Sequence, residues 1–146
     1  MKATRRQARE WAIQMLTAAD LNPPSDIDRF MASFWEQISD LDEEDGGPQT
    51  SPPNRMKRFA EERVAGVLGS LHELDEIIGS RLVGWDLSRL GVVERAVLRL
   101  GVWEMKSADV PPAVAINEAI DLANWFAGSK TRAIVNGVLD HYAKER

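Results

Sequence analysis

Residues 90–105 are the stretch that most restricts how this chain can fold. Only four of them are charged, namely Glu94, Arg95, Arg99 and Glu104. Drawn as a helix with about 100° between successive residues, the segment carries apolar side chains on every side. A helix that is apolar nearly all round is buried. We therefore expect residues 90–105 to form a central helix that other helices surround.

The apolar residues elsewhere in the chain also follow a helical spacing. They recur at intervals of three and four in residues 8–19, 27–41, 56–82, 116–123 and 135–142. This period is typical of amphipathic helices, and no stretch alternates over the length of a β-strand. The predicted fold class is therefore all-α, with about seven helices.

Several short signals predict where helices begin and end. Thr4 followed by Gln7 has the form of a capping box, so the first helix is expected to begin there. Asp86 or Ser88 is expected to cap the central helix.

Glycines give further local signals. Gly66 and Gly69 predict a kink or a division into two helices, and Gly128 suits the end of a helix. Gly137 lies within a helical pattern, where a glycine permits close contact with another helix.

Composition excludes several classes of site. The 146 residues suit one domain, 1–146, and include no cysteine, so a disulfide framework, a thiolate metal site and a cysteine nucleophile are excluded. Two histidines far apart and no glycine-rich phosphate loop leave no catalytic, metal or cofactor site that we would predict. No apolar run is long enough to span a bilayer, so a cytoplasmic protein is expected. Residues 42–54, DEEDGGPQTSPPN, are expected to form an exposed loop within the domain.

The net charge of -5 is unevenly distributed. Lys2, Arg5, Arg6 and Arg9 lie beside the apolar stripe of the first helix, and Lys2 belongs with them only if the helix reaches back that far. Guanidinium groups match phosphate oxygens, which favours contact with nucleic acid. The alternative is a solvated helix face, and composition alone favours it.

Polar residues within the central and following helices allow two interpretations. Charges are seldom buried unpaired, so Glu94, Arg95 and Arg99 either pair with one another or reach a surface that binds a partner. Asn117 and Asn136 are expected to be structural rather than catalytic, because buried amides must find hydrogen-bond partners.

Three separate blocks of sequence resemble a known family. VERAVLRLGVWE (93–104), VAINEAIDLA (114–123) and IVNGVLD (134–140), together with RRQARE (5–10), closely resemble the NusB family of bacterial transcription antitermination factors. The resemblance covers most of the chain outside the middle loop. It implies two small helical bundles packed together and no catalysed reaction. It also implies binding of boxA, a single-stranded RNA element of ribosomal RNA leader transcripts, together with the ribosomal protein NusE, within an RNA polymerase antitermination complex.

The resemblance also assigns roles to particular residues. Arg5, Arg6 and Arg9 match the family's arginine-rich RNA-binding motif, and Glu94 falls where the central helix meets NusE. A second RNA-facing region is matched by a run of four residues, Ser129, Lys130, Thr131 and Arg132.

Two departures from the family pattern bear on RNA recognition. Gln7 interrupts the arginine run, and Ile134 stands where the family usually has phenylalanine. If the family's ring stacks on a base, its loss costs about 1–3 kcal/mol. Lys130 and Arg132 can offset this loss through phosphate contacts, which discriminate less between sequences, so RNA affinity should survive better than sequence specificity. The alternative function is that of a NusB-like accessory module for RNA binding or protein interaction in a methyltransferase system that modifies ribosomal RNA.

Overall fold

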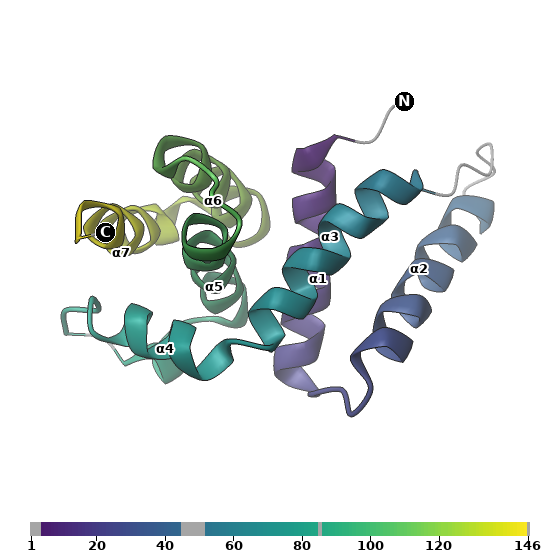
Figure 1. The fold of residues 1–146 in the computed structure, drawn as a ribbon, viewed down its shortest axis with the longest axis horizontal. Helices are drawn as coiled ribbons and strands as arrows, with labels where there is room; N and C mark the ends of the chain where they lie inside the picture. Colours follow the sequence, from purple (N-terminus) through teal and green to yellow (C-terminus); the bar gives the residue numbers. More distant parts are fainter. Residues whose placement is uncertain (1–3, 45–51, 85, 146) are drawn as a thin grey trace. The chain divides into compact units, whose positions relative to one another are not determined.

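The computed structural model describes residues 4–44, 52–84 and 86–145. Throughout these ranges the regular structure is helical, which confirms the predicted all-α class (Figure 1). The α-helices are α1 (Arg5–Leu21), α2 (Ile27–Glu44), α3 (Asn54–Leu68), α4 (Leu71–Gly79), α5 (Val92–Ser107), α6 (Pro112–Ala127) and α7 (Arg132–Glu145). Two short 3-10 turns, η1 (Leu87–Arg89) and η2 (Ser129–Thr131), precede α5 and α7.

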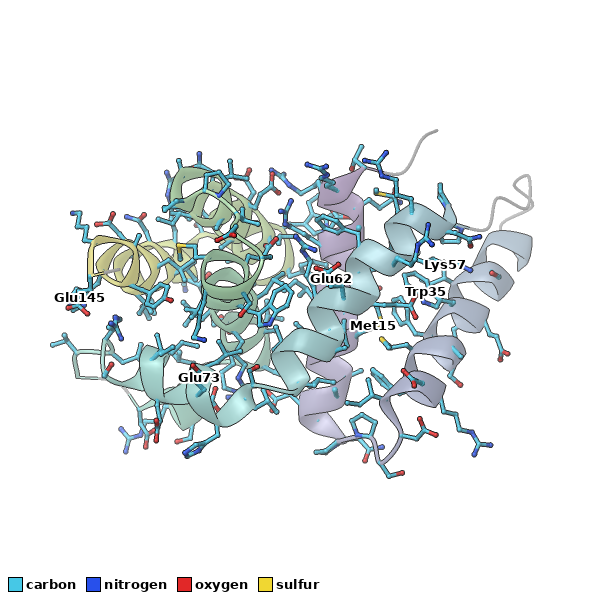
Figure 2. The ribbon with its side chains drawn as sticks, viewed as in Figure 1. Met15, Trp35, Lys57, Glu62, Glu73 and Glu145 are labelled. Atoms are coloured by element: carbon cyan, nitrogen blue, oxygen red, sulfur yellow. The ribbon has the colours of Figure 1, made fainter. Side chains whose placement is uncertain are left out.

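The chain forms two compact units, as expected for two small bundles, and the boundary between them falls after Ala65, within α3. In the first unit the rings of Trp11 and Trp35 pack edge to face, with centroids 5.4 Å apart, and so join α1 to α2. Figure 2 labels Met15 and Trp35 among the side chains of this unit, and both are buried. Burial of these large apolar groups is the main source of stability for a small bundle.

In the second unit α5 is the central helix, in contact with α4, α6 and α7. Leu98, Leu100 and Met105 of α5 are almost completely buried, together with Leu122 of α6 and Leu139 of α7. The prediction of a surrounded helix at residues 90–105 is confirmed.

Two of the predicted helix boundaries are confirmed. The hydroxyl oxygen of Thr4 accepts a hydrogen bond from the backbone N–H of Gln7 at 3.1 Å, so α1 begins as expected. The expected division near Gly66 and Gly69 falls between Leu68, the last residue of α3, and Leu71, the first residue of α4.

The predicted cap of the central helix is wrong. The carboxylate of Asp86 accepts from the backbone N–H of Ser88 at 3.3 Å and caps the turn η1, whereas the residue at the cap position of α5 is Gly91. A separate helical turn therefore lies between the capping carboxylate and the central helix. The loop expected at residues 42–54 is also shorter than predicted, because α2 extends to Glu44 and α3 begins at Asn54. Residues 45–51 lie outside the described ranges.

Glycine has different roles at three positions. Gly128 ends α6 with φ +86°, as predicted, because this conformation is easily reached without a side chain. The close helix contact predicted for Gly137 is wrong, because a Cβ there would meet nothing within 4 Å. That contact belongs to Gly101, where a Cβ would lie 2.9 Å from Cδ1 of Leu139. Gly101 lies on the buried helix, whereas Gly137 lies on an exposed face of α7.

Candidate functional site

The arginines at the start of α1 occupy three different environments. Arg5 is exposed, Arg6 is half-buried, and Arg9 is only 5 % exposed. The expectation that Arg9 shares a solvent-facing arc with Arg5 is therefore wrong. The long apolar stem of arginine can cover other apolar groups, and this lets Arg9 contribute to packing. Lys2 lies outside the described residues, and phosphate contact by any of these four side chains stays a prediction.

Phe59 of α3 organises these arginines. The guanidinium carbons of Arg5, Arg9 and Arg63 lie 6.0, 5.2 and 3.5 Å from the centroid of its ring. Arg63 also donates a hydrogen bond to the backbone oxygen of Phe59 at 3.4 Å. The negative face of an aromatic ring attracts a cation but does not cancel its charge. Sequence reasoning missed Phe59, because nothing in its local pattern indicates which helix its ring will meet.

Arg95 and Arg99 of α5 have hydrogen-bond partners within their own unit. Nε and one terminal nitrogen of Arg99 donate to the two carboxylate oxygens of Asp75 on α4, at 2.8 and 3.0 Å. The side chains of this pair are 12 % and 32 % exposed. Arg95 donates to the backbone oxygen of Leu90. A carboxylate partner of Arg99 is thus found on a neighbouring helix, 24 residues away in the sequence.

Glu94 lies in the first turn of α5 and is half-buried. Its carboxylate is close to Gly91, where an added Cβ would come within 2.2 Å of Oε2. A carboxylate in this position interacts favourably with the positive end of the helix dipole. Glu94 therefore helps to stabilise the start of the central helix, and its contact with a partner stays a prediction.

The junction between α6 and α7 displays two cations. After Gly128 the chain forms η2, and α7 begins at Arg132. Ser129, Lys130 and Arg132 are exposed, whereas Thr131 is half-buried and its hydroxyl donates to the backbone oxygen of Gly128 at 3.3 Å. The structure thus brings the second predicted group together as one short basic segment.

The two asparagines of the matching blocks are both exposed, Asn117 on α6 and Asn136 on α7. The expectation that their amides are buried is wrong, and their structural rather than catalytic role stays a prediction. Their immediate surroundings explain this, since Ala119 and Val135 on the same helices are the buried residues and the asparagines lie on other faces.

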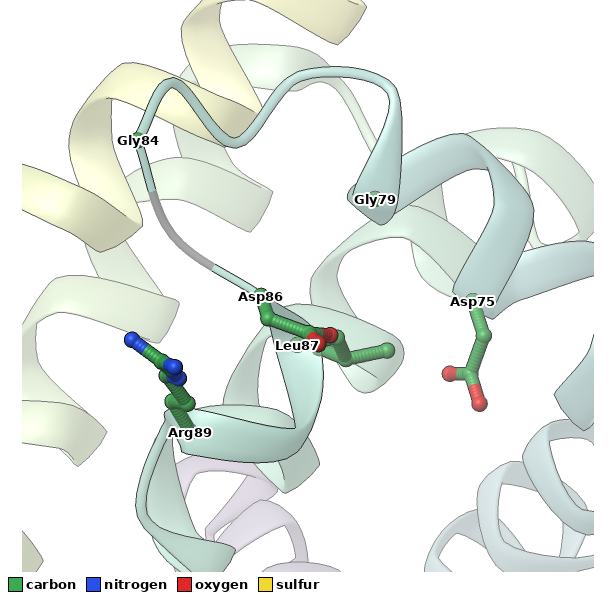
Figure 3. Close-up of a pocket in the computed structure, with 6 residues that line it drawn as sticks. All are labelled: Asp75, Gly79, Gly84, Asp86, Leu87 and Arg89. Carbon is green, nitrogen blue, oxygen red and sulfur yellow. The ribbon is translucent and has the colours of Figure 1, made fainter.

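A pocket of about 650 Å³ lies in the second unit (Figure 3). It is lined by Asp75, Gly79, Gly84, Asp86, Leu87 and Arg89. Both carboxylates already accept hydrogen bonds, that of Asp75 from Arg99 and that of Asp86 from the backbone of Ser88. The lining residues that the structure describes include no hydroxyl or thiol nucleophile and no histidine base.

Across residues 4–44, 52–84 and 86–145, no group of three or more histidine, aspartate or glutamate side chains is placed to hold a metal ion. In the same ranges, no helix combines the length and the apolar character needed to cross a membrane.

Comparison with known proteins gives consistent results. The sequence model of the NusB family matches residues 6–144. The transcription antitermination protein NusB of Nitratiruptor sp. is 38 % identical over 143 residues, which cover 98 % of this chain and 94 % of that protein.

Solved structures agree with the sequence comparison. NusB of T. maritima matches with a TM-score of 0.82 at 28 % identity, covering 100 % of this chain and 94 % of the other. A crystal structure of the antitermination factors NusB and NusE in complex with dsRNA matches with a TM-score of 0.73 at 28 % identity, covering 97 % of both chains.

Proposed function

Because this chain belongs to the NusB family, we propose that it is a transcription antitermination factor that binds RNA together with NusE. The RNA in this proposal is a boxA-type single-stranded element of ribosomal RNA leader transcripts, and the outcome is processive transcription of ribosomal RNA. The names of its relatives and the similar complex of NusB, NusE and RNA support the proposal. No chemical step is part of this role, and its place is the cytoplasm, where RNA polymerase works.

The observation that carries the RNA-binding part is the exposed guanidinium of Arg5, which lies 6.0 Å from the centroid of Phe59. A cation held near a ring has lost part of its freedom before RNA arrives, so less order must be gained on binding. Arg5 and Arg6, with Lys2, are proposed to contact phosphates. Arg9 is proposed to act with them mainly by holding the first turns of α1 in place.

The second RNA contact is proposed at Ser129, Lys130, Thr131 and Arg132. Lys130 and Arg132 provide charge for phosphate oxygens, and the two hydroxyl groups provide hydrogen bonds. In this proposal residues 1–146 work as one RNA-binding domain, with one contact in each compact unit.

The NusE contact is proposed at the start of α5, centred on Glu94. Arg95 and Arg99 are proposed to support this surface, since their contacts with Leu90 and Asp75 fix the helix beneath it. Contact with RNA polymerase is proposed for the assembled complex.

The test is to titrate labelled boxA RNA with this chain alone, with NusE alone, and with both. A scrambled single strand and a duplex of equal length serve as controls, because the similar solved complex contains dsRNA. We expect the two proteins together to bind the boxA strand at least tenfold more tightly than either control. Equal affinity for boxA and scrambled RNA would contradict the boxA assignment.

Variants separate the two parts of the proposal. Changing Arg5 and Arg6 together to alanine should lower the slope of log affinity against log salt by about 0.7 for each lost phosphate contact. Glu94→Arg should weaken binding of NusE and leave the RNA affinity of the chain alone unchanged, because a reversed interfacial charge opposes its partner.

A further inference from the structure

Trp125 is an aromatic side chain left in solvent at the end of α6. It is 76 % exposed, and among the large hydrophobic side chains that are exposed in the described residues it is the single aromatic one. Tryptophan is buried on average in folded proteins, because its indole has a large apolar surface. Neither the sequence pattern nor the family resemblance assigns a role to this ring.

Trp125 lies a few residues before the basic segment 129–132 in the chain. α6 ends at Ala127, Gly128 turns the chain with φ +86°, and η2 begins at Ser129. Four residues of chain span at most about 14 Å, so the backbone of Trp125 lies within that distance of Ser129. The exposed cations Lys130 and Arg132 follow directly.

An exposed indole that precedes two exposed cations by a few residues of chain matches the requirements of an unpaired RNA strand. Aromatic rings stack on bases, and nearby positive groups bind the phosphates that link those bases. The acidic residues earlier on the same helix, Glu118 and Asp121, lie about two turns and one turn before Trp125 and have interaction partners of their own.

Ile134, which stands where the family usually has phenylalanine, bears on how this region recognises an RNA base. It is half-buried on α7 and lines an apolar pocket of about 430 Å³ with Val83 and Ala133. An aliphatic side chain offers no ring face for a base. Trp125 supplies an exposed ring at the end of α6.

We propose that Trp125 stacks on an unpaired base of the RNA strand whose phosphates Lys130 and Arg132 contact. This inference rests on the proposed function and adds one binding residue to it. A base in a duplex is already stacked and paired, so Trp125 favours single-stranded over double-stranded RNA. Because every base has a ring face, the contact raises affinity without reading sequence.

The decisive variant is Trp125→Leu, which keeps an apolar side chain but removes the ring. We expect about tenfold weaker binding of boxA-like single-stranded RNA, an unchanged salt slope because no charge is lost, and unchanged binding of duplex RNA. Trp125→Phe should stay within about threefold of the parent. Val114→Ala, an exposed apolar position in the first turn of the same helix, is the matched control and should bind as the parent does.

Fluorescence gives a second measurement. The chain has five tryptophans, so the difference in emission between the parent and Trp125→Phe isolates the signal of one indole. Saturating single-stranded RNA should quench this difference signal, whereas an equal concentration of duplex RNA should leave it unchanged.

The outcomes distinguish this inference from the function on which it rests. If Trp125→Leu binds single-stranded RNA as tightly as the parent while the Arg5 and Arg6 double variant loses affinity, the stacking role is overturned and the RNA-binding function stands. If Trp125→Leu weakens binding of NusE and leaves RNA affinity unchanged, the ring belongs to a protein contact and the inference is equally overturned. If the parent binds none of the RNAs, with or without NusE, both proposals fail together.

Discussion

Helices α1 and α5 both carry arginines that the sequence marks as interface candidates, and the two groups have different companions. Arg5 and Arg9 of α1 lie near the ring of Phe59, whereas Arg99 of α5 is held by both carboxylate oxygens of Asp75. A ring holds a guanidinium without neutralising it, and a carboxylate neutralises it. The exposed guanidinium of Arg5, which lies near a ring, therefore retains its charge for an anionic ligand, whereas the charge of Arg99 is balanced by Asp75.

The α1 group is itself divided between exposed and buried positions. Arg5 is exposed and has the ring of Phe59 on one side, whereas Arg9 is buried. One arginine is thus available to a ligand, and another fixes the helix that presents it. The long apolar stem of an arginine can pack at a buried position, as at Arg9, while an arginine one turn away stays in solvent, as at Arg5.

The largest expected effect comes from removing the carboxylate partner in α4. Asp75→Ala leaves Arg99 partly buried without that partner, which should lower the free energy of unfolding by about 2–3 kcal/mol, less than for a fully buried pair because Asp75 is 32 % exposed. Urea unfolding followed by circular dichroism measures the change. The salt slope of RNA binding should not move. A midpoint equal to that of the parent would show that the pair contributes nothing to stability.

The buried arginine of α1 should give a smaller effect of the same kind. Arg9→Ala removes a side chain that is 5 % exposed, so we expect a loss of about 1–2 kcal/mol in stability. Arg5→Ala, the matched variant on the exposed side, should change stability by less than about 0.5 kcal/mol. Equal thermal midpoints for the two variants would contradict the division of roles within α1.

Replacing the ring tests whether it positions Arg5. Phe59→Leu keeps an apolar side chain but removes the ring face, so RNA affinity should fall about threefold to fivefold although every arginine remains. The salt slope should fall by less than the roughly 0.7 expected for loss of a whole contact. Phe59→Tyr retains a ring and should restore the affinity. Loss of affinity in the tyrosine variant equal to that in the leucine variant would mean that packing, not the ring face, matters.

The smallest effect is expected at a second ion pair between α4 and α5. Nζ of Lys106 lies 2.8 Å from a carboxylate oxygen of Glu73, and this hydrogen bond and charge raise the pKa of Lys106 above its usual 10.5. A raised pKa means that the stabilisation is fully present below pH 10.5 and is lost as the pH rises through the folded-state value. Both side chains are well exposed, so Glu73→Gln should change the urea midpoint at pH 8 much less than Asp75→Ala does.

The pH dependence checks that pair further. The difference in midpoint between the parent and Glu73→Gln should shrink as the pH is raised past 10.5. A difference that stays constant between pH 8 and pH 11.5 would show that the Lys106 charge is not its source.

The helices and several of their ends follow from the sequence, because the signals for them are local. Apolar spacing of three and four predicts a helix wherever it occurs, and the Thr4 cap and the Gly128 ending depend on neighbours within a few residues. The family blocks likewise predict the NusB fold and the location of the basic segment at residues 129–132, since a match of sequence blocks needs no contact information.

Contacts between helices were decided by the tertiary structure. The spacing of residues fixes the angle at which Arg9, Asn117 or Gly137 leaves its own helix, but it does not say which side another helix covers. That is why Arg9 is buried although it lies on the charged arc, and why the close contact of α5 with α7 falls at Gly101. The pairing of Arg99 with Asp75 and the approach of Phe59 to α1 join residues that are far apart in sequence, and only the packed fold brings them within reach.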